Sequence, residues 1–391
     1  MKKYRLHNGT VITDSGLQNM DLLISNGKID GLISAVSVVS KDYTLVDCSD
    51  KFISPGFVDI HQHGGGGSDY MDDDSDSYVR ATRAHLKHGI TSVMPTLLSA
   101  DPEMTIQAVQ AYNSACRDDR IHTNLLGLHI EGPYISAEQA GAQKPEHIRD
   151  FDKFEYQRIW EASEGNVRRW SVAPELPGSA EFASFANDNH ITLSIAHSNA
   201  DLDTVKRAFD DGYQHITHLY SCMSTITRKD GFRVPGVLEA AYLLDDMNVE
   251  IISDGCHLPL DLLRYVTKFK NNAKIALVTD AMRAAGETVT ESYLGSADDP
   301  LPVVIEDGVA KMMDRKAFAG SVATGDRLVR TMLASGVSLV EAVRMVTCNP
   351  LNMMQLNIKK GSILPGYDAD LCVFDENIHI DKVFINGKQV V

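Results

Sequence analysis

The sequence lacks the features that mark several large classes of protein. No run of about 18 apolar residues occurs among its 391 positions, so we predict no membrane-spanning helix. The opening residues MKKYRLHNGT carry two lysines but no apolar stretch, which argues against a secretory signal peptide. The six cysteines are scattered and never spaced C-x-x-C, which excludes a disulfide framework or a thiolate zinc finger. This use of cysteine suits a reducing compartment, and we expect the protein in the cytoplasm.

Basic residues are also in short supply. The chain has 37 Lys and Arg against 53 Asp and Glu, which gives a formal net charge of −16. A general nucleic-acid or membrane-surface binder needs a basic face, so neither partner is expected. Hydrophobic residues make up 43% of the chain, enough to bury a sizeable core at this length. At roughly 100–200 residues per domain, the length predicts two domains or one large domain with an appendage.

Both ends of the sequence have the pattern of short β-strands joined by tight turns. Asp21–Ile24 precedes one Asn-Gly pair, and Lys382–Ile385 precedes another. Asn-Gly is the preferred pair for a two-residue hairpin turn. Neither end could bury much apolar area alone. We therefore predict a small β-sandwich domain formed by residues 1–55 together with residues 355–391.

Residues 56–354 alternate short apolar runs with helical patterns. Asp101-Pro102 is a good start for a helix over Met104–Ala115, and Ser338-x-x-Glu341 is a capping box. The predicted strands are Phe57–Ile60, Ile90–Pro95, Leu125–Ile130, Val167–Pro174, Ile191–Ala196, His215–Leu219, Val249–Ser253 and Ile275–Thr279. Eight strand-helix units predict an α/β fold of the (β/α)8 barrel type over 56–354, with an open doubly wound sheet as the alternative. The stretch 285–320 breaks the rhythm and is interpreted as an inserted hairpin or loop.

The residues with metal-binding chemistry stand where the predicted strands end. Active sites of such barrels lie at the C-terminal ends of the strands. The side chains at five of these ends are His61 and His63, Glu131, His197, His218, and Asp280. Imidazole and carboxylate without thiolate suit Zn²⁺, with Mn²⁺, Fe²⁺ or Co²⁺ as alternatives. The competing interpretation, separately hydrogen-bonded core residues, would have to hold at five strand ends at once.

Three further histidines and a glycine run lie outside the predicted metal-binding set. His257 follows Asp254-Gly255-Cys256 at the end of the seventh strand and is expected either to bind substrate or to cap a loop. His85 and His88, three apart in a helical pattern, are expected at the surface. The run Gly64–Gly67 lacks the lysine of a phosphate-binding loop, so we interpret it as a connector that passes close to the site.

Several motifs together resemble a known family. PGFVDIHQHG (55–64) is similar to the opening strand of the amidohydrolase superfamily. More specifically, LHIEGPYIS (128–136), AHSNA (196–200), THLY-x-x-M (217–223), DG-x-H (254–257), VTDAM (278–282) and AGS (319–321) resemble the N-acetylglucosamine-6-phosphate deacetylase family. The likeness runs through essentially the whole chain, and the motifs occur in the same order.

The resemblance implies metal-dependent hydrolysis of the acetamide of N-acetylglucosamine 6-phosphate, which yields glucosamine 6-phosphate and acetate. It implies that Glu131, His197 and His218 hold the main metal ion. It also implies that His61 and His63, with Asp280, can hold a second ion, so that each subunit binds one or two. Asp280 would accept a proton from the attacking water and donate it to the departing amine.

The resemblance also implies how the substrate is bound. The segment Arg233-Val234-Pro235-Gly236 fits the family's phosphate-binding arginine, with Arg228 as the alternative. In relatives this arginine reaches across a dimer interface, so a homodimer is expected. The other implied substrate contacts are Ala142, Gln143, Ser221, Cys222, Asp254, His257, Phe318, Ala319 and Gly320.

Two of these positions depart from the family's pattern. Gln143 stands where the family has histidine, and Ser221-Cys222 stands where it has Asn-Ala. Glutamine can donate a hydrogen bond but cannot carry a proton. The departures leave open a galactosamine epimer, another N-acyl amino-sugar phosphate, or another amidohydrolase substrate such as a cyclic amide. A catalytically inactive barrel scaffold is the alternative from a different class.

Overall fold

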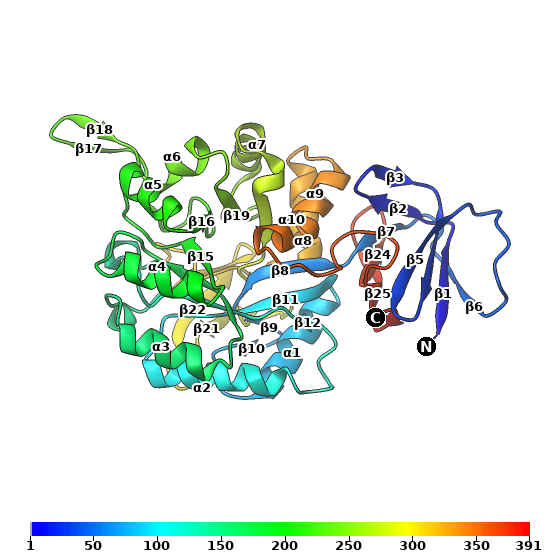
Figure 1. Cartoon of the computed structure of the whole chain (residues 1–391), viewed down its shortest axis with the longest axis horizontal. Coiled ribbons are helices and arrows are strands. Elements are labelled where there is room, and N and C mark those ends of the chain that lie inside the picture. The colour runs from blue at the N-terminus through cyan, green and yellow to red at the C-terminus, as the bar shows by residue number, and fades with distance from the viewer. Residues whose placement is uncertain (1) are drawn as a thin grey trace.

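The computed structural model describes residues 2–391, which form a barrel with a smaller β-sheet region beside it (Figure 1). Both termini lie in the smaller region, at one side of the barrel. The backbone amide of Gly56 donates to the carbonyl of Asp370 (2.8 Å), and the rings of Phe57 and Phe374 lie 6.2 Å apart. These contacts join the two parts of the molecule. No helix within residues 2–391 is long and apolar enough to cross a membrane.

Eight parallel strands form the barrel, which confirms the predicted fold class. They are β8 (Phe57–Gln62), β11 (Ile90–Leu97), β13 (Leu128–Glu131), β14 (Val167–Val172), β15 (Thr192–Ile195), β16 (Tyr213–Ile216), β19 (Asn248–Ile252) and β20 (Ile275–Val278). Each pairs with the next in this order. Between the last and the first strand, the amide of Asp280 donates to the carbonyl of His61 (2.9 Å), and Thr279 Oγ1 donates to Asp59 Oδ2 (2.5 Å). These bonds bring β20 against β8.

The predicted bounds of the third strand were wrong. Residues 125–130 were expected to form one strand, but Asn124–Leu125 forms a separate short strand, β12, and β13 begins at Leu128. Gly127 separates the two with a φ of +117°, a backbone conformation that suits glycine and interrupts a strand.

A helix follows each barrel strand and covers the outside of the barrel. The helices are α1 (Ser75–Leu86), α2 (Pro102–Ala115), α3 (Lys153–Ala162), α4 (Ser179–Asp188), α5 (Leu202–Asp210), α6 (Val237–Leu243), α7 (Leu260–Phe269), α8 (Gly325–Ala334), α9 (Leu339–Met345) and α10 (Cys348–Met353). Asp101 caps α2 by accepting from the amide of Glu103 (3.0 Å), and Ser338 caps α9 by accepting from the amide of Glu341 (3.3 Å). Both predicted helix starts are therefore confirmed.

The terminal segments form two sheets that share one apolar core. The first contains β1 (Lys3–His7), β4 (Asp21–Ser25), β5 (Lys28–Ile33) and β6 (Tyr43–Asp47). The second contains β2 (Thr10–Thr13), β3 (Gly16–Gln18), β7 (Phe52–Pro55), β24 (Leu371–Phe374), β25 (Ile380–Ile385) and β26 (Lys388–Gln389). Leu6, Ile24, Ile53 and Phe384 are fully buried between them. The domain boundaries proposed from the sequence stay a prediction.

Three small antiparallel sheets lie outside the barrel strands. β9 (Gly64–Gly65) and β10 (Ser68–Asp69) form a short hairpin after β8. β21 (Glu291–Leu294), β22 (Leu301–Glu306) and β23 (Val309–Met312) form an antiparallel sheet within the irregular stretch 285–320, one strand more than a hairpin. β17 (Thr227–Lys229) and β18 (Phe232–Val234) form a hairpin that projects away from the barrel (Figure 1).

Candidate active site

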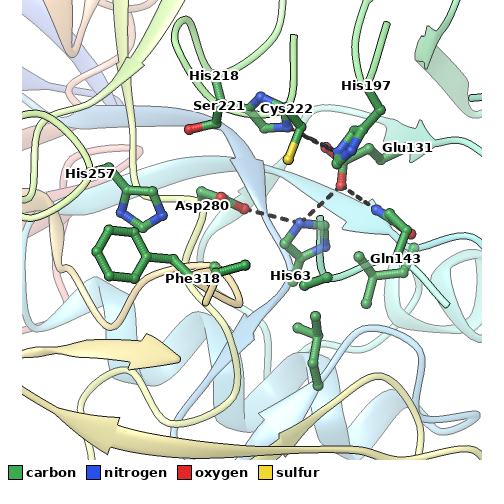
Figure 2. Close-up of a pocket in the computed structure, with 15 residues that line it drawn as sticks. His63, Glu131, Gln143, His197, His218, Ser221, Cys222, His257, Asp280 and Phe318 are labelled. Carbon is green, nitrogen blue, oxygen red and sulfur yellow. Dashed lines mark hydrogen bonds and ion pairs between the residues drawn. The ribbon is translucent and has the colours of Figure 1, made fainter. Parts of the chain in front are cut away.

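The six predicted metal-binding side chains meet at the mouth of the barrel. His61 lies in β8 and His63 just after it, Glu131 is the last residue of β13, and His197, His218 and Asp280 each lie two residues past a strand end. All six are buried. The strands thus bring together residues that are separated by up to about 220 positions in the sequence. Figure 2 shows five of them around the pocket.

Glu131, His197 and His218 form the first cluster. Glu131 Oε1 lies 3.3 Å from His197 Nε2 and 3.0 Å from His218 Nε2. The two imidazole Nε2 atoms lie 3.2 Å apart. Three potential ligand atoms therefore form a nearly equilateral triangle.

His61, His63 and Asp280 form a second triangle beside the first. The two Nε2 atoms lie 3.3 Å apart, and Asp280 Oδ1 lies 3.1 Å from His63 Nε2 and 3.5 Å from His61 Nε2. Glu131 stands between the clusters, with Oε2 3.4 Å from His63 Nε2 and Oε1 3.6 Å from His61 Nε2. Its carboxylate can therefore face both clusters.

Both triangles have the dimensions of a metal site. Ligand atoms about 2.0–2.1 Å from a tetrahedral ion are separated from one another by about 3.3 Å. The separations within the two clusters run from 3.0 to 3.5 Å. Each cluster would provide three ligands, the number that catalytic zinc sites take from the protein. The residues therefore fit a divalent metal ion.

Second hydrogen bonds orient three of the four imidazoles. His63 Nδ1 lies 3.2 Å from the carbonyl of Thr96, and His197 Nδ1 lies 2.7 Å from the carbonyl of Gln139. His61 Nδ1 lies 3.2 Å from Glu250 Oε2. Because these oxygens are acceptors, each Nδ1 carries a proton and each Nε2 faces the cluster, where it can hold a second proton or bind a metal ion.

The charges of the site support one another. Burial would raise the pKa of Glu131, but the charge of His61 and hydrogen bonds from His197 and His218 hold that pKa well below its usual value. Burial likewise opposes the charged form of His61, yet Glu131 and Asp280 raise the pKa of its imidazole to about 10. The pKa of Asp280 is lowered, since His61 and His63 outweigh the effect of burial. The two carboxylates thus create a strong demand for positive charge, which either protons or a metal ion can meet.

Three of the six residues have strained backbones. His197, His218 and Asp280 have φ values of 45°, 30° and 47°, in the left-handed region that non-glycine residues rarely adopt. Such conformations concentrate at functional sites, where the surrounding structure holds them in place. Glu175 provides part of this support, because it accepts from Ser198 Oγ (2.7 Å) and from the amide of Asn199 (2.5 Å). Glu175 was missed in the sequence, although it closely follows the fourth strand.

A pocket opens above the clusters and contains most of the predicted substrate contacts. It is lined, besides the metal-binding side chains, by Leu98, Ala142, Gln143, Ser221, Cys222, His257, Leu294, Ala317, Phe318 and Gly320. Figure 2 shows Phe318 and His257 on one side and Gln143 on the opposite side. Leu98 and Leu294 were not predicted, because nothing in an apolar residue distinguishes a pocket wall from a core.

Gln143 is held by two hydrogen bonds. Its amide nitrogen donates to Glu131 Oε2 (3.0 Å), and its amide oxygen accepts from the backbone of Ser99 (2.9 Å). One N–H of the amide remains for a bound molecule. Gln143 therefore touches the carboxylate of the first candidate metal cluster directly.

Four predicted contacts do not line the pocket, and two of these, Asp254 and Ala319, are neighbours of residues that do. Asp254 lies behind His257, whose Nδ1 is 2.8 Å from Asp254 Oδ2, so the carboxylate orients the imidazole instead of lining the pocket. The His257 ring packs against Phe318, with centroids 4.7 Å apart. Ala319 is fully buried, and its amide bonds to the carbonyl of Ala310 (3.0 Å).

The two candidate phosphate-binding arginines are absent from the lining of this pocket. Arg228 and Arg233 face each other across the exposed β17–β18 hairpin, and neither lines the pocket. Figure 1 shows this hairpin as a projecting arm. A single subunit therefore does not bring either arginine to the metal clusters.

The expected surface position of His85 was wrong. His85 is 1% exposed, and its Nε2 lies 2.9 Å from the carbonyl of Gly64, directly after His63. His88, three residues later, is partly exposed and lies 3.1 Å from Asp326. Helical spacing placed both histidines on one face but could not reveal that the β9–β10 hairpin covers half of it.

Comparisons with known proteins agree with this geometry. The model of the amidohydrolase family matches residues 52–390. The N-acetylglucosamine-6-phosphate deacetylase of Lysinibacillus sphaericus is 30% identical over 386 residues, which cover 98% of this chain and 96% of the relative. The N-acetylgalactosamine-6-phosphate deacetylase of Escherichia coli O157:H7 is 27% identical over 361 residues, 92% of each chain. A solved structure of an N-acetyl-D-glucosamine-6-phosphate deacetylase variant from Mycobacterium smegmatis, in complex with N-acetyl-D-glucosamine-6-phosphate, has a TM-score of 0.91 at 29% identity and covers 100% of both chains.

Proposed function

The chain belongs to the amidohydrolase family, and from this premise we propose that it hydrolyses N-acetylglucosamine 6-phosphate to glucosamine 6-phosphate and acetate. The observation that carries the proposal is the pair of metal-sized clusters at the base of a pocket at the barrel mouth. A relative that matches the whole chain holds this substrate in its solved structure. The reaction belongs to amino-sugar breakdown. A scaffold without activity would have no need of six buried ligands.

Glu131, His197 and His218 would hold the main metal ion, and His61, His63 and Asp280 a second one. Zn²⁺ fits the donor set best, with Fe²⁺, Mn²⁺ or Co²⁺ as alternatives, because the ligands would be imidazole and carboxylate without thiolate. When bound, the ion polarises the amide carbonyl and lowers the pKa of water at the site from 15.7 to about 7.

Asp280 would move the proton that the reaction requires. The lowered pKa of its carboxyl group keeps it ionised near neutral pH, so that it can accept a proton from the attacking water. It would then donate this proton to the nitrogen of the breaking amide bond. The amine leaves poorly until it is protonated, so this second transfer matters. His257 and the free N–H of Gln143 would hold the sugar on either side.

The phosphate requires a cation that the pocket does not supply. No Lys or Arg stands among the described residues that line it, and the net charge of −16 repels an anion. Arg233, or Arg228 as the alternative, sits on a projecting hairpin that is exposed in the monomer. We propose that the chain is a homodimer in which this arginine enters the neighbouring subunit's pocket.

A galactosamine epimer is the second candidate substrate. The relative from Escherichia coli is named for N-acetylgalactosamine 6-phosphate and matches 92% of this chain. Gln143, Ser221 and Cys222 all line the pocket and depart from the pattern expected of a glucosamine enzyme. These residues affect the choice of sugar more than the chemistry.

The proposal extends to the location of the protein and to its domains. All six cysteines are free thiols, in keeping with a cytoplasmic location. We also propose residues 56–354 as the catalytic domain and residues 1–55 with 355–391 as the β-sandwich domain.

The test is an acetate-release assay with purified, metal-supplemented protein. The panel contains N-acetylglucosamine and N-acetylgalactosamine, each with and without a 6-phosphate, and one cyclic amide. We expect release from N-acetylglucosamine 6-phosphate, with a higher kcat/KM than for the unphosphorylated sugar. Equal turnover of both sugars would contradict the phosphate-specific proposal. Faster turnover of the galactosamine epimer would select the second candidate.

A further inference from the structure

A buried ion pair lies inside the barrel, beside the second metal cluster. Arg169 comes from β14 and Glu250 from β19, and they are 0% and 1% exposed. Arg169 Nη1 donates to Glu250 Oε1, and Arg169 Nη2 donates to Ser194 Oγ (3.0 Å) and Thr217 Oγ1 (3.1 Å). Barrel interiors are usually filled by apolar layers, and removing two charges from water is unfavourable. The pair therefore requires an explanation beyond stability.

The second oxygen of Glu250 contacts a metal-binding histidine. Glu250 Oε2 lies 3.2 Å from His61 Nδ1, the ring nitrogen that faces away from the cluster. His63 and His197 are held at the same position by backbone carbonyls. His61 alone among the four imidazoles is held by a carboxylate. A carboxylate in this position orients the ring, fixes its tautomer and makes its other nitrogen a stronger ligand.

We propose that Glu250, held in place by Arg169, is the positioning residue that makes His61 a metal ligand. Through His61 it determines whether a second ion binds at His61, His63 and Asp280. This inference rests on the metal chemistry of the proposed function. Glu250 lines no part of the pocket, and His61 is the imidazole that it holds. Its Oε2 also accepts from the backbone amide of His218 (3.4 Å), which leaves the His218 imidazole untouched.

The substitution Glu250→Gln tests this role because Arg169 constrains the new amide. Arg169 has only donors, so it will bind the amide oxygen and turn the NH₂ group toward His61. His61 Nδ1 must then accept instead of donate. The proton moves to Nε2, which removes the lone pair that a metal ion needs. The variant keeps the shape of the side chain but gives His61 the wrong tautomer.

Three further variants serve as reference, control and alternative to Glu250→Gln. His61→Asn removes the imidazole ligand, so its zinc content is the reference value for a protein without the second metal site. Glu155→Gln is the matched control, since Glu155 is also a buried partner of an arginine, 2.9 Å from Arg149 Nε, but contacts no metal-binding residue. Glu250→Asp keeps the charge opposite Arg169 and withdraws the carboxylate from His61, in case Glu250→Gln does not fold.

Metal content is the readout. Each protein is titrated with Zn²⁺ by calorimetry, and bound zinc per subunit is measured by mass spectrometry after dialysis. We expect two ions in the unsubstituted protein and in Glu155→Gln. We expect one tightly bound ion in Glu250→Gln and in His61→Asn. In Glu250→Asp the second event is expected to weaken by roughly 10–100-fold, the usual effect of changing a group that supports a ligand.

The outcomes separate this inference from the proposed function. Two ions bound with unchanged affinities in Glu250→Gln and Glu250→Asp would overturn the positioning role. Loss of both ions in Glu250→Gln, with Glu155→Gln intact, would show a structural role and overturn it as well. An unsubstituted protein that binds one ion and releases acetate would overturn the inference and leave the function standing. An unsubstituted protein that binds no ion and releases no acetate would overturn both.

Discussion

Lowering the pH from 7.5 to 5 is expected to remove about 2 kcal/mol of folding free energy through His85 alone. Burial lowers the pKa of this imidazole from 6.5 to about 4, although a hydrogen bond to the Gly64 carbonyl and the charge of Asp326 partly oppose the shift. Nε2 donates to the Gly64 carbonyl, so an added proton must enter at Nδ1. Nδ1 is buried and has no hydrogen-bond partner within residues 2–391. The folded protein therefore resists a proton that the unfolded chain accepts.

The direction and magnitude of this pH effect follow from the difference in proton affinity between the folded and the unfolded state. A group with a lowered pKa in the folded state stabilises the fold above pH 6.5, and this contribution disappears as the pH falls toward 4. With pKa values of 6.5 unfolded and about 4 folded, the loss is near zero at pH 7.5 and about 2 kcal/mol at pH 5. His85 packs against the hairpin that follows His63, so this pH effect acts beside the second candidate metal cluster.

The measurement compares the protein with His85→Gln, which keeps an N–H donor but does not titrate. Urea unfolding is followed by the fluorescence of the fully buried Trp170, at both pH values and at one metal concentration. The stability advantage of His85 over glutamine is expected to fall by about 2 kcal/mol between pH 7.5 and 5. His122→Gln is the control, because His122 is exposed in the folded chain. A fall of less than about 0.5 kcal/mol would refute the reasoning.

The remaining predictions concern the site. Asp280→Asn is expected to lower kcat by about 10²–10⁴-fold, the usual contribution of general acid-base catalysis, while the fold and the ion at Glu131 are retained. Near-normal acetate release by this variant would show that Asp280 is not the general acid-base residue. Arg233→Ala is expected to raise KM for the phosphorylated sugar roughly 10–100-fold and to leave the unphosphorylated sugar unaffected, whereas the same result with Arg228→Ala alone would reverse the assignment. Gly141→Ala would place a Cβ 2.5 Å from Cys222 Sγ at a φ of +59°, so we expect a loss of about 1–2 kcal/mol in thermal unfolding and a raised KM. A chelator is expected to lower the melting temperature, since an ion at 1,000 times its dissociation constant contributes about 4 kcal/mol; an unchanged melting temperature would count against bound metal.

The barrel and its clusters were predictable from the sequence because two local signals coincide. Apolar runs marked the eight strands, and the residues with ligand chemistry stood just after them. Parallel strands in a closed barrel all point the same way, so Glu131, His197, His218 and Asp280 had to meet at one end. The topology alone therefore predicts that these side chains converge, whereas their division into two clusters was implied by the family resemblance.

The supporting residues could not be predicted, because their roles depend on which way a buried side chain faces. Arg168 and Arg169 are adjacent in β14, yet the first is exposed and the second lies inside the barrel. Strands of a parallel barrel are covered on both faces, so alternation of polarity does not reveal the direction. The role of Asp254 was not predictable for a similar reason. The conformation of its loop places its carboxylate behind His257, and the sequence does not reveal that conformation.

The pairing of β7 with β24 has a consequence for synthesis. Phe52–Pro55 leaves the ribosome early, but its partner Leu371–Phe374 is made more than 300 residues later. At about 5–20 residues per second, the delay is on the order of 15–60 s. During this interval one edge of β7 has no hydrogen-bonding neighbour, and an open strand edge readily pairs with other chains. A nascent chain of this architecture is therefore expected to need shielding by a chaperone until its last twenty residues emerge.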